Sequence, residues 1–208
     1  HFFSKTSRKL NFNNFDESTL NFELQQASND TYLKTYKVKS PIIKDTNLLS
    51  SFFEVSAYRD DLSFDTNFQV YENLSVKGSD RYEVIYPSYD VIKNLSNPTD
   101  LNGNFSIYSS GYLKNYNTNV YDRVIINDFI FNSDALYTDE GFKNNYNILI
   151  KNINTDSDNS TKYKNSQDHK LASIFEYNSS YPLKKTSANF NDILKPKMSL
   201  KYSPNNTK

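Results

Sequence analysis

The chain has 208 residues, the size of one domain or of one large piece of a domain. Lys plus Arg and Asp plus Glu both number 24, and this zero net charge argues against a nucleic-acid-binding protein. The chain has no cysteines and only two histidines, His1 and His169, which excludes disulfides, thiolate zinc sites and histidine-rich metal sites and leaves no cofactor to expect.

The chain is polar, with a mean hydropathy of −0.75, yet it contains 17 Tyr and 15 Phe. A disordered chain of this polarity would be poor in aromatic residues. No apolar run approaches the roughly 20 residues of a membrane-spanning helix. The chain begins at His1 without a signal-peptide pattern and finishes in a turn-like segment, 203–208, so we expect an internal fragment of a longer protein.

Alternation of apolar and polar residues with period two dominates the chain and predicts β-strands. It is clearest at residues 62–70, where Leu62, Phe64, Phe68 and Val70 alternate with Ser63, Asp65, Asn67 and Gln69. The other predicted strands, in chain order, are 20–25, 48–58, 81–86, 104–113, 118–131, 142–153, 170–177 and 194–202.

Turn signals separate these strands. They are Arg59-Asp60-Asp61, Lys77-Gly78-Ser79-Asp80, Asn97-Pro98-Thr99-Asp100 and Asn102-Gly103. The polar stretch 154–169 predicts a loop, and no segment shows a convincing helical period. The pattern therefore predicts an all-β fold, an antiparallel meander of about nine to eleven amphipathic strands.

Two environments explain amphipathic strands. In a secreted or surface β-sandwich that binds glycans or proteins, the apolar faces meet in a core. In a transmembrane barrel the apolar faces meet lipid and the polar faces meet a wet lumen. Strands of about ten residues and abundant Tyr favour the barrel, either a porin-like channel or another type, but periodicity alone leaves both environments open.

No combination of residues predicts catalysis, so we expect a protein that is not an enzyme. His169 is interpreted as a solvated loop residue, and Asp60-Asp61 as charges in a tight turn. The segment Asp156-Ser157-Asp158-Asn159 lacks the Gly and Glu of a calcium loop. Lys195, Lys197 and Lys201 form a basic strand face, which suits solvent, anionic lipid head groups or an acidic partner.

Four segments, in order, resemble the barrel of the lipopolysaccharide-assembly outer-membrane protein family (LptD, also called OstA or organic solvent tolerance protein). Ser28-Asn29-Asp30-Thr31-Tyr32-Leu33 resembles its Ser-Asp-Asp-Thr-aromatic-Leu segment, from which it departs at Asn29. The second segment is the hairpin 48–71, which ends in Asn67-Phe68-Gln69-Val70-Tyr71. The third is the strand Asp80-Arg81-Tyr82-Glu83-Val84-Ile85-Tyr86-Pro87, and the fourth is the start of a strand at Leu194-Lys195-Pro196-Lys197.

The resemblance covers roughly residues 18–205. It implies that residues 1–208 are early-to-middle strands of a large outer-membrane β-barrel, without the family's N-terminal jelly-roll and closing strands. The implied function is non-enzymatic insertion of lipopolysaccharide into the outer leaflet of the cell outer membrane. The implied partners are lipopolysaccharide, an LptE-like plug lipoprotein in the lumen, a periplasmic bridge protein that acts through the N-terminal domain, and outer-membrane lipid, with no nucleic acid.

Barrels of this kind place short turns in the periplasm and longer loops outside. If the 59–61 turn is periplasmic, the links near 93–103, 132–141 and 178–193 share its side, and 72–80, 114–117 and 154–168 are extracellular. The row Leu62, Phe64, Phe68 and Val70 then faces lipid, and the row Ser63, Asp65, Asn67 and Gln69 faces the lumen. The sequence does not indicate which of these lumenal residues touch a ligand.

Overall fold

The structure is a computed structural model that describes residues 1–96, 102–187 and 190–204. It is all-β with two very short helices, and no helix among these residues is long and apolar enough to cross a membrane. The elements, in chain order, are β1 (Phe2–Leu10), β2 (Glu17–Gln26), α1 (Tyr32–Thr35), β3 (Leu48–Arg59), β4 (Leu62–Asn73), the 3-10 helix η1 (Ser79–Arg81), β5 (Tyr82–Leu95), β6 (Gly103–Tyr116), β7 (Val120–Ser133), β8 (Leu136–Tyr137), β9 (Lys143–Asp158), β10 (Asp168–Ser180), β11 (Leu183–Thr186), β12 (Asn191–Leu194) and β13 (Lys197–Tyr202).

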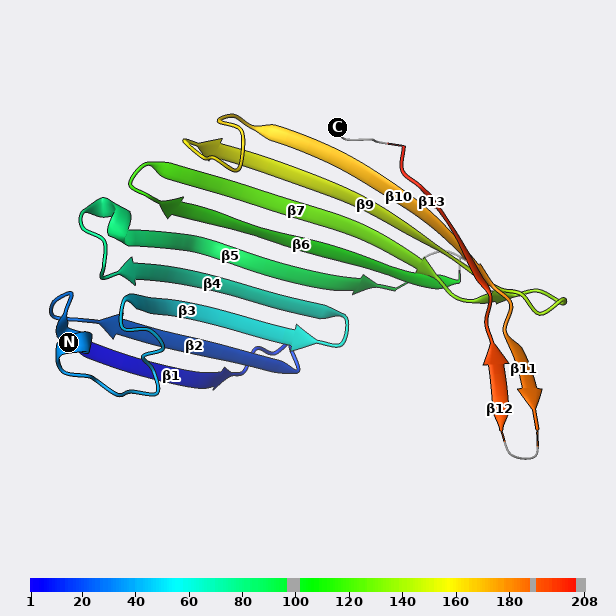
Figure 1. Cartoon of the computed structure of the whole chain (residues 1–208), viewed down its shortest axis with the longest axis horizontal. Coiled ribbons are helices and arrows are strands. Elements are labelled where there is room, and N and C mark those ends of the chain that lie inside the picture. The colour runs from blue at the N-terminus through cyan, green and yellow to red at the C-terminus, as the bar shows by residue number, and fades with distance from the viewer. Residues whose placement is uncertain (97–101, 188–189, 205–208) are drawn as a thin grey trace. The chain divides into compact units, whose positions relative to one another are not determined.

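Eleven strands form one antiparallel sheet in the order β1-β2-β3-β4-β5-β6-β7-β9-β10-β13, with β8 paired to β9 (Figure 1). β11 and β12 form a separate two-stranded sheet. Nearly every strand of the large sheet pairs with the next one along the chain, so the predicted antiparallel meander is confirmed. The described strands do not close into a barrel, because the strand order begins at β1 and ends at β13.

The hairpin of β3 and β4 shows why neighbouring strands pair. Its register runs without interruption from Leu48 opposite Asn73 to Arg59 opposite Leu62. Only Asp60 and Asp61 lie between the two strands, and a two-residue link permits little other than an antiparallel hairpin. The predicted tight turn at this place is confirmed.

The chain divides into two compact units. The first comprises His1–Ile92, Ser109–Ile126 and Ile153–His169. Its buried cluster consists of Leu33, Leu49 and Leu74, with Phe3, Ala27, Tyr32, Val38 and Ile43 packed against it. Leu33 reaches this cluster because the link between β2 and β3 folds into the single turn of α1. This link is therefore anchored to the sheet by apolar contacts.

The second unit comprises Lys93–Tyr108, Asn127–Asn152 and Lys170–Lys208. A row of aromatic rings crosses its strands, centred on the buried Phe131. The Phe131 ring lies 4.4 Å from that of Phe105 and 5.5 Å from that of Tyr146, measured between centroids. Tilted contacts at these distances are favourable beyond the area that they bury.

Several predicted boundaries were wrong. The segment 194–202 is not one strand, because Leu194 ends β12, where it pairs with Leu183, and Lys197 begins β13, where it pairs with Ser180. Pro196 between them has no N–H to donate to a ladder. The link 178–193 is long because it contains most of the β11–β12 hairpin.

The polar stretch 154–169 is also shorter as a loop than predicted, since β9 extends to Asp158 and β10 begins at Asp168. Gly103 is the first residue of β6 rather than a turn residue, and a Cβ there would lie 2.5 Å from the carbonyl oxygen of Asn132. The predicted turn 97–100 lies outside the described residues, as does most of the segment 203–208.

Candidate functional site

The strands β2 to β4 of the first unit have one polar and one apolar face, and β1 adds polar residues to both faces. The register places Asn21 opposite Glu54, which is opposite Asn67, and it places Phe22 opposite Phe53, which is opposite Phe68. Because paired residues share a face, the alternating rows predicted for single strands join into continuous surfaces. The polar row of β4, Ser63, Asp65, Asn67 and Gln69, belongs to the surface that we call the polar face.

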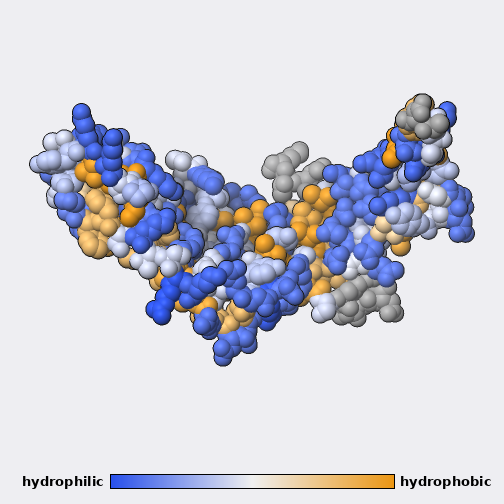
Figure 2. All heavy atoms as spheres, turned by 90° about the horizontal axis from the view of Figure 1, so that it is seen from below, coloured by the Kyte–Doolittle hydropathy of each residue, from blue (hydrophilic) through white to orange (hydrophobic). Residues whose placement is uncertain are grey.

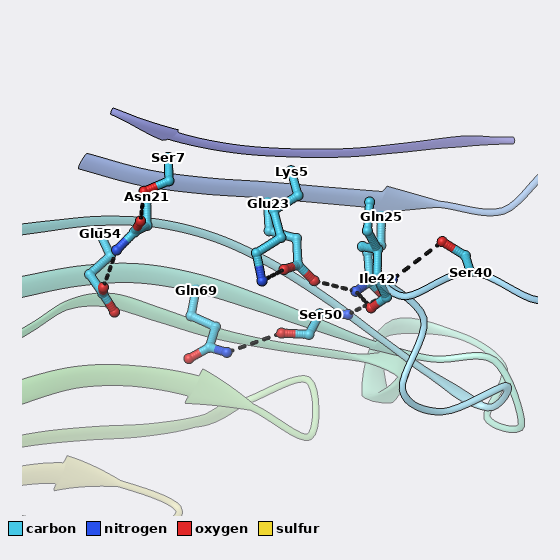
Figure 3. A network of polar contacts seen from close by, with 10 residues as sticks. All are labelled: Lys5, Ser7, Asn21, Glu23, Gln25, Ser40, Ile42, Ser50, Glu54 and Gln69. Atoms are coloured by element: carbon cyan, nitrogen blue, oxygen red, sulfur yellow. Dashed lines mark hydrogen bonds and ion pairs between the residues drawn. The ribbon is translucent and has the colours of Figure 1, made fainter. Parts of the chain in front are cut away.

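Hydrogen bonds run across the strands on the polar face (Figure 3). The Ser7 hydroxyl of β1 donates to Asn21 Oδ1 of β2 at 2.7 Å. Asn21 Nδ2 in turn donates to Glu54 Oε1 of β3 at 2.9 Å. An amide between a hydroxyl and a carboxylate uses its acceptor and a donor at once, so this chain of contacts fixes the orientation of the Asn21 side chain.

Glu23 and Gln25 are the most buried polar residues of this face, with exposed fractions of 5% and 7%. Gln25 Nε2 donates to Glu23 Oε1 at 2.6 Å and to the carbonyl oxygen of Ile42 at 3.0 Å (Figure 3). Lys5 Nζ lies 3.4 Å from the Glu23 carboxylate. The link between β2 and β3 therefore covers this end of the polar face, and a buried carboxylate is tolerated because it has both a hydrogen bond and a cation.

The apolar face of the same strands is far less covered at the middle of β3 and β4. Phe53 is 39% exposed and Phe68 is 46% exposed, and their rings meet edge-on at 6.4 Å. Apolar side chains reach the surface in patches between hydrophilic ones (Figure 2). Phe22, Phe53 and Phe68 lie in register on three neighbouring strands and are each at least 36% exposed, so this row is suited to contact with an apolar medium or an apolar partner.

Arg81 joins two segments that are distant in the sequence. Its guanidinium contacts the carboxylates of Asp30 at 2.6 Å and Glu72 at 2.7 Å, and its side chain is only 18% exposed. Desolvation lowers the pKa of Arg81, but the hydrogen bonds and charges of Asp30 and Glu72 raise that pKa above its ordinary value. The guanidinium therefore remains charged and ties the link after β2 to the start of β5.

The residues considered above as candidates for catalysis or metal binding do not lie together in one site. His169 Nδ1 lies 2.7 Å from Asn154 Oδ1 on the surface, and Asp61 accepts from Arg59 Nε at 2.6 Å. Within 1–96, 102–187 and 190–204 there is no group of three His, Asp or Glu side chains that could hold a metal ion. Asp60 lies exposed in its turn.

The segment 156–159 is held together by its own contacts. Ser157 is buried and donates its hydroxyl hydrogen to the carbonyl oxygen of Lys164 at 2.6 Å, while Asp156 faces Arg123 at 3.7 Å. These contacts hold the end of β9 against the following loop. Asn159 Nδ2 donates to the carbonyl oxygen of Asn119 at 3.0 Å, which connects that loop to the link before β7.

The buried pair Glu23 and Gln25 and the cluster around Arg81 were missed by sequence reasoning. Glu23 and Gln25 were recognised only as the polar side of a strand, and no local pattern shows that a link 17 residues away covers them. Compared with known proteins, the chain matches no protein-family model and no curated protein.

Proposed function

We propose that this chain is a section of the wall of an outer-membrane β-barrel whose function is to insert lipopolysaccharide into the outer leaflet without covalent chemistry. The observation that carries the membrane part is the division of β2 to β4 into an exposed apolar face and a hydrogen-bonded polar face. In a barrel wall the first face meets lipid and the second meets the lumen.

The lipopolysaccharide part rests on the four segments that resemble the LptD family. The contact between Asp30 and Arg81 supports it, because it joins the first of these segments, 28–33, to the third, 80–87. Two stretches that resemble one family in sequence thus meet in space. The proposed partners follow from the same resemblance: lipopolysaccharide and an LptE-like plug in the lumen, and a periplasmic bridge protein.

Photo-crosslinking in cells that make the protein tests the proposal. A photoreactive amino acid at Asn67 or Gln69 on the polar face is expected to capture lipopolysaccharide or a plug lipoprotein. The same group at Phe68, on the opposite face, is expected to capture phospholipid or the lipid A acyl chains of the outer leaflet only after assembly. Absence of lipopolysaccharide and plug adducts at both polar positions, in a protein that assembles in the outer membrane, would contradict the transport function.

A porin-like channel is the second candidate, and the polar face with its hydrogen-bonded row favours a water-filled lumen in either case. Conductance separates the two. A porin-like channel gives steady ion currents in a planar bilayer as the protein alone, whereas a lumen filled by a plug lipoprotein passes current only when the plug is removed.

A further inference from the structure

A hollow of about 280 Å³ lies in the second unit, where β9, β10 and β13 run side by side (Figure 1). Three lysines and several neutral hydrogen-bonding residues line it, and no carboxylate does. The principal ones are Lys143, Asn145, Asn178, Lys195, Lys197 and Ser199. We call this place the lysine hollow. At about 30 Å³ per water molecule, it has room for a small anion with several waters.

The polar residues of β10 and β13 in the lysine hollow share one face of the sheet. Asn178 is opposite Ser199, and Ser180 is opposite Lys197. The Ser180 hydroxyl also donates to the carbonyl oxygen of Lys143 at 3.4 Å, which connects β9 to the same place. Residues of three neighbouring strands therefore line one hollow.

Lys195 and Lys197 are held on either side of Pro196. The carbonyl oxygen of Pro196 accepts a hydrogen bond from the Tyr181 N–H at 3.1 Å, so the chain between β12 and β13 is fastened to the end of β10. The backbone that carries the two lysine side chains is thus fixed at this point. This reduces the conformational freedom that the lysines lose when they close on a ligand.

The charge of these lysines is not neutralised locally. Lys201, farther along β13, faces Glu176 at 3.6 Å, but Lys143, Lys195 and Lys197 have no carboxylate partner among the residues that the structure describes. Residues 183–202 contain five lysines and one aspartate, a net charge of +4 in a chain whose total is zero. The ammonium groups of lysines that share a hollow repel one another, and an anion bound there would add attractions that offset this repulsion.

We propose that the lysine hollow binds a phosphate group, either free or on the head group of a lipid. Lysine ammonium groups bind phosphate as point charges, and the Asn and Ser side chains supply neutral donors for the remaining oxygens. A tetrahedral dianion meets donors from several directions, as three strands provide here, whereas a planar carboxylate needs fewer. The inference stands on the hollow itself and does not rest on the proposed transport function.

The test uses the full chain in maltoside micelles, which contain no phosphate. Binding of inorganic phosphate is followed by phosphorus NMR, and binding of phosphatidic acid is followed in mixed micelles, with diacylglycerol of the same acyl chains as the lipid without phosphate. The variant is Lys143→Gln, Lys195→Gln and Lys197→Gln combined. The matched control is Lys34→Gln, Lys37→Gln and Lys39→Gln, three exposed lysines of the link between β2 and β3 with the same change in charge.

The wild-type chain is expected to bind at least one of the two phosphate probes and not diacylglycerol. Binding should weaken about tenfold or more in the Lys143, Lys195 and Lys197 variant and less than about threefold in the control, since three partly exposed ion pairs are lost in the first only. Binding of inorganic phosphate alone identifies a soluble anion as the ligand, and binding of phosphatidic acid alone identifies a head group.

The proposal is overturned if the wild type binds neither probe, or if both triple variants weaken binding equally, because the effect is then one of net charge. Far-UV circular dichroism checks that strand content is unchanged. Should the triple variant lose strand content, the single changes Lys195→Gln and Lys197→Gln replace it, and each is expected to weaken binding about threefold. Unchanged binding in both single variants would then contradict the proposal.

Discussion

Replacement of Phe68 tests which medium covers the apolar face. Phe68 lies at the middle of β4 (Leu62–Asn73), close to the bilayer centre if the strand spans a membrane. An Arg or Lys on the lipid face of a barrel costs about 2–4 kcal/mol at the midplane. In water, a substitution at a half-exposed surface position usually changes stability by no more than about 0.5 kcal/mol. The two environments therefore predict different outcomes for Phe68→Arg.

Part of the loss in Phe68→Arg would come from the Phe53–Phe68 ring contact, worth about 0.5–1.5 kcal/mol in either environment. Phe68→Ala removes the same contact without adding a charge. The difference between Phe68→Arg and Phe68→Ala is thus the informative quantity. In a barrel wall it should be about 2–4 kcal/mol, and in water it should be close to zero.

The control is the neighbouring residue on the other face. Asn67 pairs in register with Glu54, so Asn67→Arg places a cation beside a carboxylate and should leave assembly intact. The folded fraction is measured across a urea series in lipid vesicles, from the difference in gel mobility between folded and heated protein. If Asn67→Arg blocked assembly while Phe68→Arg and Phe68→Ala unfolded at the same urea concentration, our assignment of the two faces would be wrong.

Three further predictions concern single contacts. Arg81→Ala should leave Asp30 and Glu72 unpaired, lower the free energy of unfolding by about 1–3 kcal/mol and expose the link between β2 and β3 to proteases. The control Arg123→Ala, which removes a longer and more exposed contact to Asp156, should cost no more than about 1 kcal/mol. Equal cleavage rates in the two variants would argue against the role of Arg81. Gly111→Ala should lower the free energy of unfolding in urea by about 1–3 kcal/mol, because its Cβ would lie 2.7 Å from the Val124 carbonyl oxygen and 2.8 Å from the Tyr89 ring. Ser110→Ala, the control at the neighbouring residue, should be nearly neutral. A cysteine that replaces Ser166, which is exposed in the loop after β9, should react with an impermeant label in intact cells, and a cysteine that replaces Ser187 should not. The opposite pattern would reverse the expected orientation of the strands. Ser157 in the same polar stretch is unsuitable for labelling because it is only 5% exposed.

Alternation in the sequence was enough to predict β4 and its two rows, because each face of that strand meets one kind of environment. β1 was missed for the opposite reason. Its residues Ser4, Thr6 and Arg8 lie on one face and Lys5, Ser7 and Lys9 on the other, so both faces are polar and no period appears. The strand exists because β2 supplies a ladder for it, and this is information that β1 itself does not contain.

The polar contacts of the candidate site were beyond prediction because they depend on register and on a distant link. Glu23 meets Phe52 in the β2–β3 register, and Gln25 reaches Ile42 only because the link folds back. The sequence predicted one basic strand face of Lys195, Lys197 and Lys201, but Lys195 lies before β13 and Lys201 faces Glu176 outside the lysine hollow. The approach of Lys143 to Lys195 and Lys197 was not predicted, because it depends on the order of β9, β10 and β13.

The distribution of burial in the first unit indicates what the sheet needs in order to be stable. Glu23 and Gln25 are more buried than Phe53 and Phe68, although the same unit also buries the apolar cluster of Leu33, Leu49 and Leu74. Covering the two rings with a protein partner would require a surface matched to side chains from several strands. In the membrane location that we propose, lipid chains would cover them without any such match and would leave the polar face, with its hydrogen bonds from Ser7 to Glu54, in contact with water. The membrane location that we propose would thus complement the exposed rings, and the difference between Phe68→Arg and Phe68→Ala tests it.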